Sequence, residues 1–253
     1  FSVVEKIIKH CAANNIKGYR LSSDLCPVIK HPDLMLELED LPNYKLIEEE
    51  INNVSAAIIR TNIRVSAHPS EYITLTSDDP IKINHSIVDL EFHAEIFERL
   101  NLSKSYYNPL NIHVRKEGNP EELSKTFIDN YNKLSSNVKS RLVLENNDTG
   151  NTWTVANLKK YFFESYGIPV TFDNLHHEML NHGVSHKDAF YDAFSTWNYS
   201  PIFHYSEGKN GTRAHKDMPD NLPINYNEDV LFDVELKNKD YAILDILKRY
   251  NER

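Results

Sequence analysis

Short runs rich in apolar and β-branched residues alternate with longer helical patterns along the chain, and this alternation constrains the fold most strongly. Strands that alternate with helices predict βα units and a parallel sheet. The seven strand candidates are 16–22, 61–67, 109–114, 141–146, 169–174, 200–206 and 231–237. The helical patterns lie near 2–14, 45–57, 82–101, 120–136, 153–165, 186–195 and 239–250.

Seven strands are one fewer than a (β/α)₈ barrel contains. The 253 residues suit one barrel or two smaller domains, and no repeat or Pro/Gly-rich linker marks a boundary. We therefore expect an α/β fold, a TIM (β/α)₈-type barrel that forms a single domain over 1–253. Because the sequence opens directly in a helical pattern, we expect either that a first strand is missing from it or that the barrel is incomplete.

Composition places the chain among globular proteins, with 40% apolar and 26% charged residues. No apolar run approaches the roughly 20 residues that a membrane helix needs, and no signal peptide pattern is visible. Two cysteines, Cys11 and Cys26, are too few for a disulfide framework. We therefore expect a protein without membrane contact in a reducing, cytoplasmic compartment.

Six successive strand candidates deliver an imidazole or a carboxylate at their C-terminal ends. These residues are His68, His113, Glu145, Asp173, His204 and Glu235, and His176 follows three residues after Asp173. Strand ends converge at this face of a barrel, where barrel enzymes build their sites. Carboxylates that converge without a cation would repel one another, and imidazole with carboxylate suits Zn²⁺ or Mn²⁺. The pattern therefore predicts a metal-dependent hydrolase.

Other polar residues near these strand ends allow two interpretations. His215 lies in a loop eleven residues past His204, where spacing alone favours a solvated side chain and a ligand equally. The run 146–148 after Glu145 either supports metal ligands or supplies ordinary turn chemistry. His93 lies in a helical pattern, and we interpret it as a surface residue.

Eight short motifs in order resemble those of the UV damage endonucleases. They are YRLSSDL (19–25), HPSEY (68–72), IHVRKEGN (112–119), LENND (144–148), FDNLHH (172–177), FHYSEG (203–208), RAHKD (213–217) and DVELKNKD (233–240). The resemblance implies a barrel close to the endonuclease IV-type AP endonucleases. It implies two or three divalent ions, Mn²⁺ or Zn²⁺ with Mg²⁺ as an alternative. It also implies incision of double-stranded DNA 5′ to a UV-damaged or abasic nucleotide, which leaves a 3′-hydroxyl.

The resemblance also assigns roles to individual residues. It implies that His68, His113 and Glu145 hold one ion, that Glu145, Asp173, His204 and Glu235 hold a second, and that His176 and His215 hold a third. Glu145, Glu235 and Lys237 are the catalytic candidates. Lys237 would share a strand face with Glu235 and contact either a phosphate or Glu235 itself. The candidates for DNA contact are His31, Arg20, Arg213, Glu71 and Tyr72.

Three features depart from the family pattern or from typical DNA-binding proteins. Family members generally carry Gln-Tyr after the His-Pro loop, where this chain has Glu71 and Tyr72, and some carry a lysine where this chain has Ile202. The net charge is −9, whereas DNA-binding proteins are usually basic. Three divalent ions would add about +6. The basic residues either gather on one face or are solvated surface charges: Arg20, Arg115, Lys116, Lys209, Arg213, Lys216, Lys237 and Lys239.

Two other functions compete with a monomeric DNA-repair endonuclease. A xylose isomerase-like sugar isomerase or epimerase would share the barrel and its strand-end ligands, and fold alone does not decide function. A single ion in a small closed pocket would favour the sugar enzyme, and three ions beside basic side chains would favour DNA. A non-catalytic DNA-binding relative is the third candidate, although every expected carboxylate is present.

Overall fold

Every strand candidate forms a strand in the computed structural model, which describes residues 1–27, 29, 30, 34 and 36–252. Each strand lies inside its predicted range and is two to four residues long. The strands are β1 (Gly18–Leu21), β2 (Arg64–Ala67), β3 (Leu110–His113), β4 (Leu142–Glu145), β5 (Val170–Thr171), β6 (Ile202–Tyr205) and β7 (Leu231–Val234). The predicted alternation of strands and helices is therefore confirmed.

The helices follow the predicted pattern with three differences. Five match single predicted segments: α1 (Ser2–Ala13), α2 (Tyr44–Thr61), α3 (Pro80–Arg99), α9 (His186–Phe194) and α10 (Lys239–Asn251). The predicted helix 120–136 is shorter in the structure, where α4 (Pro120–Tyr131) ends at Tyr131 and the separate short helix α5 (Ser136–Lys139) follows. The pattern 153–165 divides into α6 (Val155–Leu158), a π-helical turn (Lys159–Phe163) and α7 (Glu164–Tyr166). Short 3₁₀ turns cover Leu38–Asp40 and Lys209–Gly211.

One helix has no counterpart in the prediction: α8 (Asn174–Met179), six residues directly after β5. Periodicity cannot reveal so short a helix. No helix among the described residues combines the length and apolar character that crossing a membrane requires.

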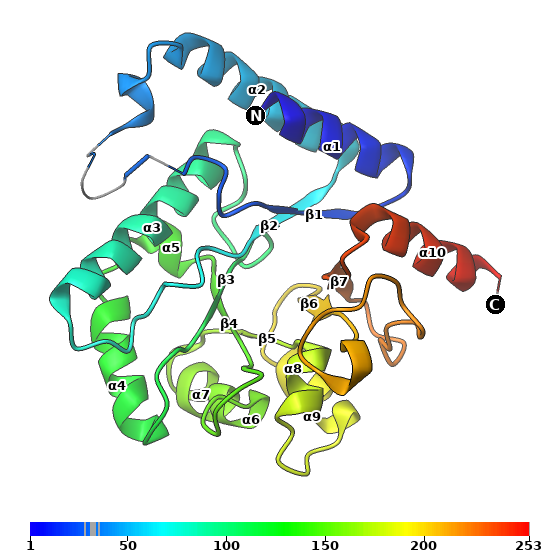
Figure 1. The fold of residues 1–253 in the computed structure, drawn as a ribbon. Coiled ribbons are helices and arrows are strands. Elements are labelled where there is room, and N and C mark those ends of the chain that lie inside the picture. Colours follow the sequence, from blue (N-terminus) through cyan, green and yellow to red (C-terminus); the bar gives the residue numbers. More distant parts are fainter. Residues whose placement is uncertain (28, 31–33, 35, 253) are drawn as a thin grey trace. The chain divides into compact units, whose positions relative to one another are not determined.

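The chain divides into two compact units, 1–116 with 125–142 and 117–124 with 143–253. In the first unit, β1 pairs with β2 and β2 with β3, all parallel. Helices α1 and α2 lie side by side (Figure 1). Ile8, Val54, Val65 and Leu90 are fully buried in the core of this unit. Whether residues 1–253 act as a single domain stays a prediction.

In the second unit, β4 pairs with β5 and β6 with β7, again parallel. A parallel bridge between Asp173 and His204 joins the end of β5 to β6. The C-terminal ends of four strands therefore point the same way. Phe172, Phe190 and Phe203 form a buried aromatic cluster behind them, with ring centroids 5.2 to 6.1 Å apart. This core supports the strand ends that carry the site.

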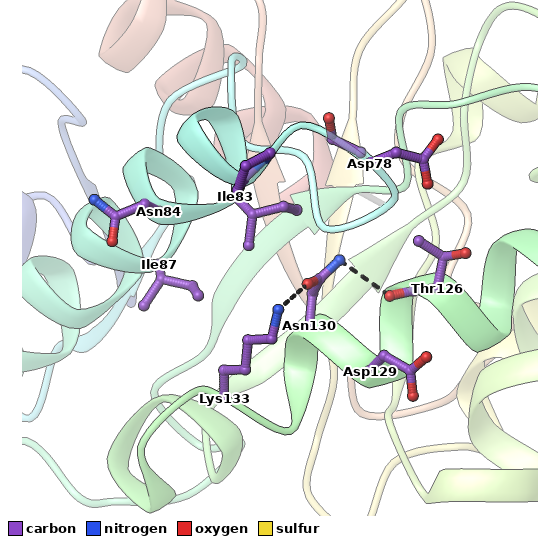
Figure 2. A pocket seen from close by; sticks show the side chains of 10 residues that line it. Asp78, Ile83, Asn84, Ile87, Thr126, Asp129, Asn130 and Lys133 are labelled. Carbon is purple, nitrogen blue, oxygen red and sulfur yellow. Dashed lines mark hydrogen bonds between the residues drawn. The ribbon is translucent and has the colours of Figure 1, made fainter.

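The first unit has a hollow of about 540 Å³ between the start of α3 and the end of α4 (Figure 2). Lys133 donates a 2.7 Å hydrogen bond to Asn130 beside it. The Asn130 amide donates in turn to the carbonyl oxygens of Thr126 and Leu75. None of the predicted metal ligands lines this hollow, so it is separate from the strand-end residues.

Candidate metal centre

The strand ends of the second unit bring buried carboxylates and imidazoles together. Asp173, His204 and Glu235 each present a ligand atom within 4.8 Å of the others, and so do Glu145, Asp173 and His176. Glu145, Asp173 and His204 are at most 2% exposed. Asp173 belongs to both of these groups. The bridging role that the resemblance implies for Glu145 stays a prediction.

The short helix α8 places His176 in the centre. Asp173 caps this helix, and its carboxylate accepts a 2.7 Å hydrogen bond from the His176 amide. A residue three positions into a helix folds back over its cap. The His176 Nδ1 atom then lies 2.9 Å from the Asn146 carbonyl oxygen and 3.1 Å from Glu145 Oε1. A helix that the sequence did not reveal therefore explains why His176 joins the strand-end residues.

Burial and neighbouring charges shift the pKa values of these groups. Burial raises the pKa of Asp173, and the nearby Glu145 and Glu235 carboxylates add to the effect against the opposing influence of His176. For His204, burial lowers the pKa, but Glu145 at 3.1 Å and Glu235 at 3.4 Å raise it to about 9. Burial likewise lowers the pKa of His176, and Asp173 and Glu145 raise it to about 11. The carboxylates therefore stabilise positive charge on the two imidazoles, as they would on a bound cation.

The donor set fits a divalent metal ion. Asp173 Oδ2 is buried and accepts no hydrogen bond from any residue the structure describes, and His204 Nδ1 lies 4.0 Å away. A buried carboxylate oxygen without a donor is costly unless a cation compensates it. Carboxylate oxygen with imidazole nitrogen is a ligand set of Zn²⁺ and Mn²⁺. The second unit therefore holds a candidate multi-metal site.

His215 lies beside Glu235 but outside both ligand groups. Its Nδ1 donates to the Glu235 carbonyl oxygen over 2.7 Å, and its Nε2 lies 3.8 Å from Glu235 Oε2. The loop that carries it pairs with Gly208. A Cβ atom on Gly208 would lie 2.3 Å from the Thr212 carbonyl oxygen, so this close return of the loop requires glycine.

In the first unit, the structure brings His68 and His113 together. Their ring centroids are 5.3 Å apart, with the planes tilted by 47°. They meet because β2 and β3 are parallel neighbours, with Ala67 opposite Leu110. Both side chains are half-buried, and His68 Nδ1 lies 3.1 Å from the Pro69 carbonyl oxygen.

The residues predicted to contact DNA have different surroundings. Tyr72 is 84% exposed, and Glu71 beside it is exposed as well. Arg20 is half-buried on β1, opposite Ser66. Arg213 is exposed and lies 3.4 Å from Asp148 Oδ2. His31 lies outside the described residues.

Several of the basic residues that could meet DNA pair with carboxylates. Lys116 lies 2.7 Å from Asp78, and Lys216 bridges Glu207 and Asp220. Ion pairs of this kind neutralise part of the positive charge of these two lysines.

The strand argument for Lys237 is wrong. Strand β7 ends at Val234, and Lys237 lies in a turn before α10, where its amide donates to the Lys216 carbonyl oxygen. Alternation of side chains applies only within a strand, so Lys237 does not share a strand face with Glu235. No ion pair joins it to Glu235 among the described residues. Its proposed phosphate contact stays a prediction.

The sequence analysis also misjudged or missed some buried polar groups. His93 is only 8% exposed, with Nδ1 2.8 Å from the Asp89 carbonyl oxygen, so its surface interpretation is wrong. It lies on the buried face of α3. Asp233 lies opposite His204 in the β6–β7 register and helps to raise the pKa of that histidine. Only the register between two strands distant in sequence could have revealed this carboxylate.

Comparison with known proteins agrees with this geometry. The family model described as UV-endonuclease UvdE matches residues 2–252. The UV DNA damage endonuclease of Nostoc sp. is 31% identical over 247 residues, which cover 92% of this chain and 72% of that protein. The crystal structure of SacUVDE superposes with a TM-score of 0.85 at 29% identity, covering 98% of this chain and 84% of the other.

More distant structures share the fold alone. Endonuclease IV from Thermus thermophilus gives a TM-score of 0.68 at 14% identity, covering 98% of this chain and 93% of that one. A D-tagatose 3-epimerase-like protein gives 0.64 at 15% identity, with 96% and 91% covered. These matches confirm the predicted α/β fold of the TIM-barrel type. The match over almost the whole chain shows that this protein belongs to the UV-endonuclease UvdE family.

Proposed function

We propose that the protein is a metal-dependent DNA-repair endonuclease that incises double-stranded DNA 5′ to a UV-damaged or abasic nucleotide and leaves a 3′-hydroxyl. The observation that carries the proposal is the buried set of carboxylates and imidazoles at the strand ends of a chain of the UvdE family. The shared barrel fold of sugar epimerases does not compete with it, because function lives in the site rather than the fold.

The ligands that we propose are those of the two groups in the second unit, together with His215 beside Glu235 and the pair His68 and His113. We propose two or three ions, Mn²⁺ or Zn²⁺ with Mg²⁺ as an alternative. Such ions, when bound, supply Lewis acidity and lower the pKa of a bound water. The ligand set is as follows: His68, His113, Glu145, Asp173, His176, His204, His215 and Glu235.

Residues of this chain contribute to metal binding and to contact with DNA. Glu145, Asp173 and Glu235 supply the negative charge that holds cations where water is largely excluded. The main-chain carbonyl oxygen of Asn146 accepts a hydrogen bond from His176 Nδ1, so Nε2 is the nitrogen that remains to bind a metal. Tyr72 is exposed and can stack on a base near the lesion.

The test is a nicking assay with an end-labelled duplex that carries one pyrimidine dimer or one abasic site, in the presence of Mn²⁺. We expect a single cut 5′ to the lesion, with a 3′-hydroxyl that DNA polymerase can extend. An undamaged duplex of the same sequence is the control. If the metal content is confirmed and neither lesion is nicked, the proposal fails. We further propose that the protein acts as a monomer inside the cell, which light scattering and fractionation test.

A further inference from the structure

Two asparagines extend the parallel sheet of the second unit beyond its strands. Asn146, directly after β4, accepts a 2.9 Å hydrogen bond from the Asp173 amide and donates a 3.1 Å bond to the Asp173 carbonyl oxygen. Asn174 does the same for Ser206, over 3.0 and 2.9 Å. Each side-chain amide thus replaces one rung of backbone pairing at a strand end.

Asn146 differs from Asn174 in what it holds. Its side chain fixes the backbone of Asp173, the residue common to both ligand groups of this unit. Its main-chain carbonyl oxygen accepts the Nδ1 proton of His176 over 2.9 Å, and a substitution of the side chain leaves this bond in place. The partner of Asn174, Ser206, belongs to neither ligand group.

We propose that the side chain of Asn146 makes it a positioning residue of the metal centre, which acts through Asp173 and touches neither metal nor DNA. This inference rests on the metal site of the proposed function. Metal ligands are commonly oriented by a hydrogen bond to their other polar atoms, and loss of such a partner typically lowers metal affinity by about 10–100-fold. Asn146 is only 1% exposed, so water cannot replace its amide.

Asn174→Ala is the matched control for Asn146→Ala. Each substitution removes one amide pair of hydrogen bonds at a strand end of the same unit, to Asp173 for Asn146 and to Ser206 for Asn174. If the bonds only stabilise the fold, the two variants lose stability and metal affinity alike. If Asn146 positions ligands, only its variant loses metal affinity beyond the effect of lowered stability.

Asn146→Asp separates geometry from charge. A carboxylate keeps the acceptor for the Asp173 amide but loses the donor to the Asp173 carbonyl, and it adds a negative charge. A purely electrostatic role predicts tighter cation binding by this variant, whereas a positioning role predicts weaker binding. This nearly isosteric substitution also decides the matter if Asn146→Ala does not fold.

The experiment strips the protein of metal and titrates it with Mn²⁺ by calorimetry, with metal content per chain measured by mass spectrometry. Thermal unfolding of the metal-free proteins measures the structural cost separately. We expect binding to weaken about 10–100-fold in both Asn146 variants and less than about threefold in Asn174→Ala. Wild-type affinity in Asn146→Ala, tighter binding in Asn146→Asp, or an equal loss in Asn174→Ala overturns the inference. A wild-type protein that binds no metal instead refutes the proposed function.

Discussion

The two units end their strands in contrasting ways. In the second unit, buried carboxylates crowd around His204, and Asp173 and His176 are held by Asn146 and by the cap of α8. In the first unit, the candidate ligands at the strand ends are two half-buried imidazoles, those of His68 and His113. Both units offer metal ligands, but the second accumulates negative charge away from water.

The difference in buried charge between the units indicates which of them needs a bound cation for its stability. Neutral imidazoles tolerate partial burial, whereas several buried carboxylates repel one another and lose hydration. We therefore expect metal binding to affect the stability of the second unit far more than that of the first.

The largest expected effect concerns Glu145. Glu145→Gln removes a charge from the centre and should lower lesion nicking by at least about 10²–10³-fold, because the charge of this buried group organises the cations of the centre. Glu98→Gln in the first unit removes an exposed carboxylate that pairs with Lys104, and it should leave nicking unchanged. Both variants should keep wild-type circular dichroism. Normal cutting by Glu145→Gln would show that the charge of Glu145 is not needed for catalysis.

Removal of metal should affect the two units unequally. A ligand at about 100 times its Kd stabilises the state that binds it by about 2.7 kcal/mol. Hydrogen exchange of the metal-free protein should therefore accelerate at the ends of β4 to β7 and change little at α1 and α2. Uniform acceleration in both units would mean that they share one stability and would remove the contrast.

Asp173→Asn should stabilise the metal-free protein while it prevents metal binding. Because burial raises the pKa of Asp173, its ionised form destabilises the fold at pH values above the unfolded pKa of about 3.9. The gain in Tm should therefore be present at pH 8 and disappear as the pH falls below about 4. His68→Ala in the first unit should change Tm little at either pH. A lower Tm for Asp173→Asn at pH 8 would contradict the electrostatic interpretation.

The smallest expected effect is at Glu71. Glu71→Gln introduces the glutamine expected from the family resemblance and removes one exposed negative charge beside Tyr72. We expect damaged DNA to bind a few-fold more tightly at low salt, since an exposed charge contributes about 0.2–1 kcal/mol and salt screens it. Fluorescence anisotropy at two salt concentrations measures the change. Weaker binding would show that Glu71 makes a specific contact rather than a general repulsion.

Much of the centre was predictable because the strand signal is local. Apolar runs bounded by helical patterns located all seven strands, and parallel strands necessarily bring their C-terminal residues to one edge. His176 was placed only approximately, because α8 is too short to show a period and depends on its Asp173 cap. The expectation that Lys237 shares a strand face with Glu235 was wrong, because β7 ends at Val234 and not at residue 237.

By itself, the sequence determined the order of strands and helices and the kinds of side chain at the strand ends, since both follow from periodicity along the chain. Only the tertiary structure decided which of these side chains share a site. Asp173 became common to two ligand groups, and Asn146 became its support, through bonds between residues 27 positions apart. Strand register and the fold of a short helix set such contacts, and neither leaves a signature in local sequence.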